Sequence, residues 1–456
     1  MEESLPCVSS MASAETLFEV PFSLNSYHVS EKLGFVLPDP LEELPPYYQP
    51  WMDIALRVPE LVHSHELRSH INKMPLLSSK FLQRHRELRL AHLALGMMTM
   101  GYVWQEGEND TVDILPCSLA VPYWEVSQRL GLPPILTHAD AVLANWKKKD
   151  PEGPFSMENL ELLVTLPGGE SVWGFFMVTL LVELAAVPAL KNIPVVINGV
   201  RNGDAEMVAL ALERIAESIE EMNDALKLMH GDSDIVTECY TFCHQKSMLI
   251  IVFIPSVRGA FSLLWGHEDL PVWVLTWKDN PTMPHGLIYE GVQMEPMEFS
   301  GGSAAQSSLL HCFDELLGVK HEENSGAFLT RMRNYMLPAH KQLIQDLSLQ
   351  PSLRAFVQQQ ASNPLKEAFH LCVTKLLALR SYHINVVSRF ITVQASLARQ
   401  MQVQSQRSKA GEMISKAPKA LEERGTGGSS IMTFLKTVRD HTKDACLSET
   451  MKEIKH

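Results

Sequence analysis

The sequence lacks the excess of positive charge on which nucleic-acid binding depends. Its 456 residues carry 39 lysine and arginine side chains against 53 aspartate and glutamate side chains, which gives a formal net charge of -14. A chain of this charge repels a phosphate backbone instead of neutralising it. We therefore expect no nucleic-acid partner.

Cysteines and long apolar runs are scarce as well. The seven cysteines are scattered and odd in number, which favours reduced thiols over a disulfide framework. Residues 1–25 have no basic start followed by an apolar stretch, so no secretory signal is predicted. The most apolar run, from Gly174 to Leu190, is interrupted by Glu183. These absences predict a cytoplasmic protein that does not enter a membrane.

The signatures of several enzyme classes are missing. The sequence has no Walker phosphate loop, no nucleophile elbow and no dinucleotide fingerprint. His65 and His70 are separated by one residue too many for a zinc-protease helix, so their imidazoles face different directions. The segment Cys239–His244 is one residue longer than the covalent haem motif, and we interpret it as a chance match. No residue is predicted to act as a catalytic acid or base.

Apolar residues spaced for helices are abundant. Hydrophobic residues make up 46% of the chain, which is enough for a sizeable core. In 205–229 they recur every three or four positions behind Asp204, a favourable N-cap. The same spacing runs through 81–98 and 365–390, whereas the alternation typical of strands is scarce. We expect an all-α protein, with a disordered leader at 1–25 and a mobile polar loop at 400–428.

A cation and an imidazole share one face of the helix predicted at 365–390. Arg380, His383 and Val387 lie at i, i+3 and i+7. Neutral imidazole is the commonest protein ligand of haem iron, and a guanidinium can clasp a propionate with two donors. A satisfied core histidine beside a surface arginine is the alternative that this spacing leaves open.

A run of small residues at 299–308 opens another predicted helix. Small side chains let the backbone approach a flat ligand closely, and the Ser303 hydroxyl can reach a bound gas or substrate. On the same helix Asp314 lies at the border of the apolar face, where a buried carboxylate needs a cation, and Arg380 is the candidate. An ordinary glycine turn with a serine cap is the alternative.

A glycine-rich segment, Arg424–Gly428, precedes the last predicted helix. Such a loop can close over a cleft and present the hydroxyl of Thr426 to a substrate. A simple flexible connection is the alternative.

Together these segments resemble the indoleamine 2,3-dioxygenases, from Tyr27 to the last predicted helix. The resemblance is carried by 379–383, 301–308, 425–428, 132–136, 143–149, 174–176 and 434–439. His138 stands where the usual family member has tyrosine. This histidine, the longer leader and Trp104–Glu108 are similar to the indoleamine 2,3-dioxygenase 2 paralogues, which are generally weak tryptophan oxidisers.

The resemblance implies a two-domain helical haem dioxygenase fold, with a small N-terminal domain at 26–165 and a large haem-binding domain at 166–456. It implies oxidation of L-tryptophan and related indoleamines by O2 to N-formylkynurenine, the first step of the kynurenine pathway, with an immune-regulatory role. We expect a monomer that holds one haem b and requires an electron donor.

The resemblance also implies roles for individual residues. His383 is the implied proximal ligand of the haem iron, with Asp314 paired to Arg380 behind the haem. The other implied cofactor contacts are Gly302, Ser303 and Ala304. The implied substrate contacts are His138, Val142, Phe175, Thr179, Ser303, Ala304 and Thr426.

The family pattern is interrupted at 231–276. There the family has a phenylalanine that packs on the indole and an arginine that binds the substrate carboxylate, and this sequence has no aligned counterpart of either. A charged hydrogen bond contributes about 1.5 to 3 kcal/mol, so we expect low activity. Whether the segment is a true variant or a replaced exon stays open.

Two other functions stay open. One is a haem protein that binds or senses oxygen without turnover. The other is a phosphotyrosine signalling protein, because Tyr123 and Tyr289 each have an aliphatic residue two positions before and another three positions after. Phosphorylated, they would dock on SH2-domain proteins. Structural tyrosines are the alternative.

Overall fold

Helices dominate the computed structural model, which describes residues 20–107, 110–230, 276–278, 280, 283–389 and 431–447. The strands in these residues are two residues long. β1 (Ile114–Leu115) pairs in parallel with β4 (Ile288–Tyr289), and β2 (Lys147–Lys148) pairs antiparallel with β3 (Leu160–Glu161). The all-α prediction is confirmed.

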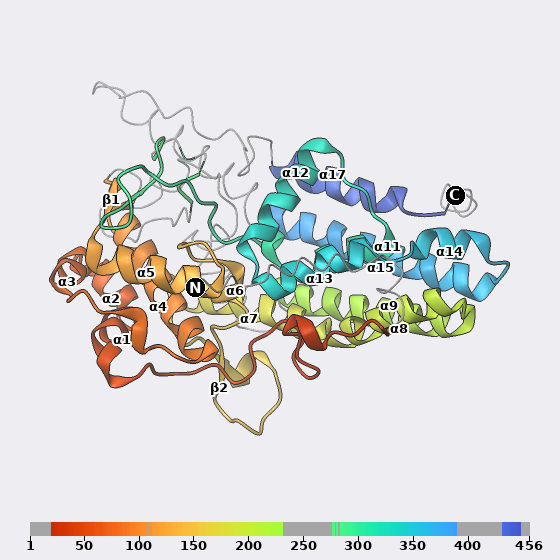
Figure 1. Cartoon of the computed structure of the whole chain (residues 1–456), viewed down its shortest axis with the longest axis horizontal. Coiled ribbons are helices and arrows are strands. Elements are labelled where there is room, and N and C mark those ends of the chain that lie inside the picture. The colour runs from red at the N-terminus through yellow and green to blue at the C-terminus, as the bar shows by residue number, and fades with distance from the viewer. Residues whose placement is uncertain are drawn as a thin grey trace, which may run out of the picture.

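The first half of the chain folds around one buried helix, α4, in the left part of Figure 1. Its helices are α1 (Gln49–Ala55), α2 (Val58–His63), α3 (Leu67–Lys73), α4 (His85–Trp104), α5 (Cys117–Leu130) and α6 (His138–Ala141). Helix α4 begins where the Glu87 carboxylate accepts hydrogen bonds from the backbone of Arg84 and Gln83, at 3.0 and 2.7 Å. It therefore starts four residues later than the predicted 81–98.

The second half is a set of packed helices in the right part of Figure 1. They are α7 (Glu170–Ala185), α8 (Val187–Asn202), α9 (Ala205–Lys227), α11 (Ser308–Leu317), α12 (Glu323–Met332), α13 (Pro338–Ser348), α14 (Leu353–Gln359), α15 (Asn363–Val387) and α17 (Ile431–Asp444). Helix α9 packs against α15, α8 and α7. Its predicted cap is present, since Asp204 Oδ1 accepts a hydrogen bond from the Met207 amide at 2.9 Å.

Helices α7 and α8 follow one another almost without a break. The stretch Val172–Asn202 is long and apolar enough to cross a membrane by length and composition, and half of its most apolar window is buried inside the structure. Core helices meet the same criterion, and both α7 and α8 pack on α9. The expectation that the chain does not enter a membrane stays a prediction.

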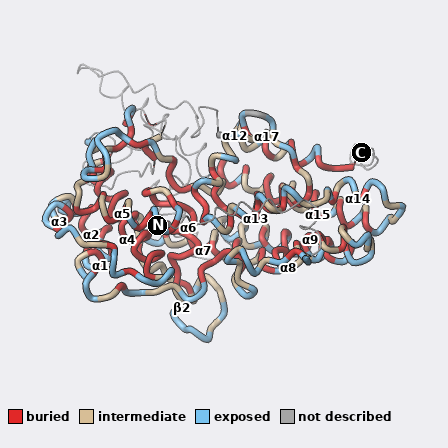
Figure 2. Tube along the Cα trace, in the orientation of Figure 1, coloured by how far each residue is buried: buried red, intermediate tan, exposed pale blue. Residues whose placement is uncertain are grey.

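Chain segments cross the predicted domain boundary at 165/166 in both directions. The Phe22 amide donates to Asn198 Oδ1 on α8, and the Tyr27 hydroxyl donates to Asp346 on α13 at 2.7 Å. In the other direction, β4 from the second half of the chain pairs with β1 in the first half. Buried residues run through the helices of both halves as one apolar core (Figure 2). The division into two domains stays a prediction.

Candidate functional site

Helix α15 carries the imidazole predicted to hold iron. The helix is fixed at its start by Ser362, whose hydroxyl accepts from the Leu365 amide, and by Pro364 in its first turn. His383 lies near its other end and is half-buried. Burial, together with the charge of Arg380, lowers the pKa of His383 to about 4. The imidazole is therefore neutral at neutral pH and keeps a lone pair for a metal. No described residue hydrogen-bonds to it.

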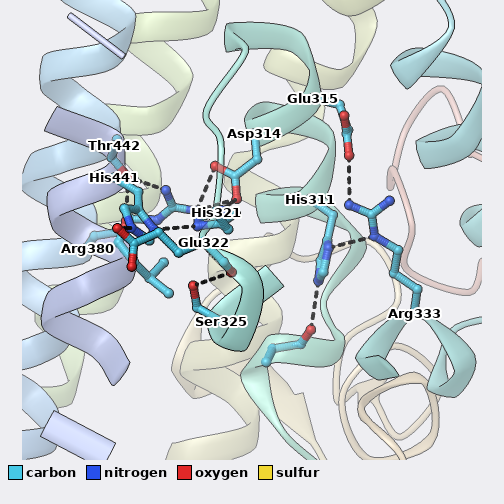
Figure 3. A network of polar contacts seen from close by, with 12 residues as sticks. His311, Asp314, Glu315, His321, Glu322, Ser325, Arg333, Arg380, His441 and Thr442 are labelled. Atoms are coloured by element: carbon cyan, nitrogen blue, oxygen red, sulfur yellow. Dashed lines mark hydrogen bonds and ion pairs between the residues drawn. The ribbon is translucent and has the colours of Figure 1, made fainter. Parts of the chain in front are cut away.

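The predicted pair between Asp314 and Arg380 is present (Figure 3). Nη2 of Arg380 donates to both carboxylate oxygens of Asp314 at 2.8 Å, and Nη1 donates to the hydroxyl of Thr442 on α17. Burial alone would raise the pKa of Asp314, but the charge of Arg380 and hydrogen bonds from His321 and Arg380 lower it to about 2. The pair is therefore ionised, and it joins α11, α15 and α17.

This arrangement corrects one sequence-based idea about Arg380. Its spacing from His383 allowed a direct grip on a haem propionate, but both terminal nitrogens are directed to Asp314 and Thr442. Arg380 is 7% exposed and acts between helices. The role that the resemblance implied for Arg380, behind the haem, stays a prediction.

The small-residue run forms a short turn before α11. A 3-10 turn covers Ala304–Gln306, with Ser303 as its cap, since the Ser303 hydroxyl accepts from the Ala305 amide at 3.2 Å. Gln306 folds back and donates to the Gly301 carbonyl at 2.8 Å. Gly302 is buried, whereas Ser303 and Ala304 are half-buried. The run therefore presents two small side chains on a backbone that hydrogen bonds within the run itself hold in place.

A buried histidine anchors the same turn from behind. The Nε2 atom of His311 lies 2.9 Å from the Ala305 carbonyl, and the Nε atom of Arg333 donates to His311 Nδ1 at 3.2 Å. An arginine can only donate, so Nδ1 accepts and Nε2 carries the proton. Burial lowers the pKa of His311 to about 4, which keeps the ring neutral in this role.

His138 lies beside this turn in a buried polar network. Its Nε2 atom is 2.8 Å from Glu183 Oε1 on α7, and the same oxygen accepts from the Ser307 hydroxyl at 2.6 Å. The backbone amide of His138 donates to Gln306 Oε1 at 3.0 Å. His138 therefore ties α6 to α7 and to the small-residue turn.

One face of α7 is apolar and left half-buried. Phe175 and Thr179 lie one helical turn apart on it, and the Thr179 hydroxyl donates to the Phe175 carbonyl at 2.8 Å. A Cβ atom added at Gly174 would meet no atom of the described residues within 4 Å, so these residues leave open space beside the helix. An apolar face with open space and a neutral imidazole as the donor are chemically suited to a haem.

The remaining predicted residues are either fully buried or lie outside the described residues. Val142 is completely buried, and its predicted contact with substrate stays a prediction. Thr426, the 400–428 loop, residues 1–19 of the leader and 231–275 of the atypical segment lie outside the described residues.

The two tyrosines predicted as phosphorylation sites are fully buried. Tyr123 and Tyr289 have no exposed surface, and the Tyr289 hydroxyl donates to the Pro134 carbonyl at 2.6 Å. Phosphorylation of either hydroxyl would therefore require local opening of the fold. Their burial favours the structural alternative, and the signalling interpretation stays a prediction.

Sequence reasoning missed several residues of these networks. Glu183 was considered only as a charge that interrupts an apolar run, although a lone carboxylate in such a helix is itself a signal that a buried partner exists. His321 and His441 gave no sequence signal, because they meet across 120 residues of chain.

Comparison with known proteins gives the same family over nearly the whole chain. The sequence profile described as indoleamine 2,3-dioxygenase matches residues 23–445. Indoleamine 2,3-dioxygenase 2 of Homo sapiens is 46% identical over 94% of this chain and 96% of its own length. Indoleamine 2,3-dioxygenase 1 of Rattus norvegicus is 43% identical over 93% of this chain and 96% of its own length. A myoglobin of Haliotis diversicolor is 36% identical over 92% of this chain and 98% of its own length. The chain therefore belongs to the indoleamine 2,3-dioxygenase family.

Proposed function

We propose that this chain is a haem-dependent dioxygenase that oxidises L-tryptophan with O2 to N-formylkynurenine. Family membership itself supports a dioxygenase, which is an oxidoreductase. The observation that carries the proposal is the His383 imidazole, which is neutral and half-buried, has no hydrogen-bond partner among the described residues, and lies one helical turn from the Arg380–Asp314 pair. A haem bound there supplies the iron at which oxygen is activated.

The chain's own residues would bind and orient. His383 would hold the iron, and the Arg380–Asp314 pair would keep α15 in place. The half-buried face of α7 at Phe175 and Thr179, together with Ser303 and Ala304, would hold the indole and exclude water. Such a site needs no acid–base pair, in agreement with the sequence.

Further details of this proposal rest on the family resemblance. They are one haem b per chain, a monomeric and cytoplasmic protein, an external electron donor, and a place at the start of the kynurenine pathway with an immune-regulatory role. Low turnover is also proposed, because the sequence at 231–276 has no aligned counterpart of the arginine that binds the substrate carboxylate.

The test is replacement of the proposed iron ligand. The full chain is expressed with added haem, and its Soret band and N-formylkynurenine formation from tryptophan under a reductant are compared with those of His383→Ala. We expect the variant to lose normally ligated haem and product together. The exposed His63→Ala serves as the control and should change neither. Unchanged haem ligation in His383→Ala would refute the assignment.

A second candidate is reversible oxygen binding without turnover. It is favoured by the myoglobin of Haliotis diversicolor, which is 36% identical to this chain over 422 residues. Both candidates give a haem spectrum. Product formation separates them, because an oxygen carrier yields an oxygenated spectrum but no N-formylkynurenine.

A further inference from the structure

We propose that Gln306 is a positioning residue of the candidate site, and that its side-chain amide sets where Ser303 and Ala304 meet the substrate. The amide contacts His138 on α6 and Gly301 at the start of the small-residue turn, and we call these two contacts the amide bridge. The consequence for tryptophan rests on the proposed function, whereas the bridge itself does not.

The bridge uses both ends of the amide group. Oε1 of Gln306 accepts from the backbone amide of His138 at 3.0 Å, and Nε2 donates to the Gly301 carbonyl at 2.8 Å. A backbone N–H can only donate and a carbonyl can only accept, so the two partners fix which end of the amide faces which. At neutral pH a carboxylate in this place would have no donor for Gly301, and an apolar side chain would serve neither partner.

Burial makes both contacts necessary. Gln306 is 2% exposed, His138 is 1% exposed, and Gly301 is buried as well. The sulfur of Met332 lies 4.0 Å from Gln306 Nε2, so the far side of the amide faces a weakly polar neighbour. Loss of the amide would leave a backbone donor and a backbone acceptor without these partners in a place closed to solvent.

The same residue closes the small-residue turn on itself. The backbone amide of Gln306 donates to the Ser303 carbonyl at 2.9 Å, while its side chain donates to Gly301. Residues 302–304 therefore lie between two contacts made by one residue. Ser303 and Ala304, which are half-buried, belong to this enclosed stretch. The position of the surface that they offer to a ligand depends on Gln306.

Helix α6 is a firm anchor for the bridge, because α4 holds its other side. The carboxylate of Asp140 accepts from the amide and the hydroxyl of Thr137 at 2.9 and 2.7 Å, and Nδ1 of His92 lies 2.8 Å from it. Arg89, one turn earlier on α4, donates to the Ala139 carbonyl. The bridge therefore ties the turn to the core of the first half of the chain.

Other contacts would keep the turn folded without the bridge. Glu183 of α7 and His311 of α11 bind the end of the turn at 305–307, and the hydroxyl of Tyr335 accepts from the Ser300 amide at 2.8 Å. Each of these groups holds one end of the turn, whereas Gln306 connects the two ends. Its removal should loosen the turn locally and leave the surrounding helices in place.

The proposed function gives this loosening a specific consequence. Ser303 and Ala304 are proposed to hold the indole together with the face of α7, whereas His383 is proposed to hold the iron from α15. A displaced turn should weaken substrate binding and leave the iron ligand unaffected. We therefore expect a higher KM for tryptophan with unchanged haem ligation.

The first variant, Gln306→Met, keeps the length of the side chain and removes both polar ends. In the full haem-loaded chain we expect KM for tryptophan to rise about ten-fold, kcat to stay within about two-fold, and the Soret band to be unchanged. Amide hydrogen exchange needs no turnover, and it should rise about ten-fold at His138 and in 301–307 but not in α9. Gln358→Met, at an exposed position on α14, is the matched control and should change none of these.

The second variant, Gln306→Glu, separates the polarity of the bridge from its packing. At about pH 8 its carboxylate would bring an acceptor to the Gly301 carbonyl, so KM and local exchange should rise. At about pH 6 they should recover, because burial raises the pKa of a carboxyl group and the protonated form can donate to Gly301. Values are divided by those of the unmodified chain at the same pH, since His138 and Glu183 also lie near the turn. Gln306→Met should not recover, and Gln358→Glu should match the unmodified chain.

The outcomes decide between a positioning residue and a structural one. Unchanged KM and exchange in Gln306→Met, or equal behaviour of Gln306→Glu at both pH values, would overturn the proposal. Loss of haem with faster exchange throughout the chain would show a general structural role and would overturn it too. If the unmodified chain formed no N-formylkynurenine, the proposed function would fail, whereas exchange at His138 would still decide whether the bridge exists.

Discussion

His138 and Glu183 form a buried pair between α6 and α7, with Nε2 and Oε1 2.8 Å apart and both side chains almost completely enclosed. The carboxylate also accepts from Ser307, so it satisfies two donors from two other elements. This pair fixes the position of the small-residue turn relative to α7. The turn and α7 are the two surfaces that the proposed function places around the indole.

Glu183→Ala should lower the free energy of unfolding by about 2–4 kcal/mol, because the partners His138 and Ser307 lose a buried acceptor. Urea denaturation measures this change. Glu217→Ala, at an exposed position on α9, is the control and should stay within about 0.5 kcal/mol. In a double-mutant cycle with His138→Ala, purely additive effects would contradict the pairing.

Asp314 should make the chain acid-sensitive over a defined range. Its pKa is lowered from 3.8 to about 2 in the folded chain, so its contribution is present above about pH 4 and is lost as pH falls toward 2. The shift corresponds to about 2 kcal/mol. Asp314→Asn should therefore remove part of the pH dependence in this range. Equal slopes of stability against pH in the two proteins would show that the carboxylate is not paired in solution.

The sequence predicted the helices whose apolar residues recur with strong periodicity. It also predicted one ion pair, between Asp314 and Arg380. Helices predicted at 205–229 and 365–390 are observed as Ala205–Lys227 and Asn363–Val387. Asp314 was matched to Arg380 because a carboxylate at the edge of an apolar face needs a cation. Both inferences use local spacing and elementary charge balance.

Contacts between distant elements could not be predicted in the same way. His138 meets Glu183 across 45 residues, and His321 meets His441 across 120. Such pairs depend on how α6, α7 and α17 pack, which periodicity within one helix does not determine. The burial of Val142 has the same origin, because the packing around α6 encloses it, and its predicted contact with substrate stays a prediction.

His311 should contribute a second pH dependence, at higher pH. Its pKa is lowered from 6.5 to about 4, so the unfolded chain binds a proton that the folded chain does not. Its contribution is full above about pH 6.5 and is lost as pH falls to about 4, with a total of about 3 kcal/mol. His311→Gln keeps a donor for the Ala305 carbonyl but does not titrate, so its stability should fall less steeply in this range.

The control for His311→Gln is a histidine replacement outside the candidate site. His63→Gln replaces an exposed imidazole and should leave the slope of stability against pH unchanged. An unaltered slope in His311→Gln would mean that His311 is already charged in the folded chain.

The two buried tyrosines offer a matched pair of hydroxyl deletions. Tyr289 donates to the Pro134 carbonyl at 2.6 Å, whereas the Tyr123 hydroxyl is buried with no hydrogen-bond partner among the described residues. Tyr289→Phe should therefore cost about 1 kcal/mol and leave an acceptor less satisfied, while Tyr123→Phe should be neutral or slightly stabilising because an unpaired buried hydroxyl is removed. Thermal and urea unfolding of the two variants measure the difference. If Tyr123→Phe were the more damaging of the two, its hydroxyl would have a partner that the described residues do not include, and the buried environment assigned to it would be wrong.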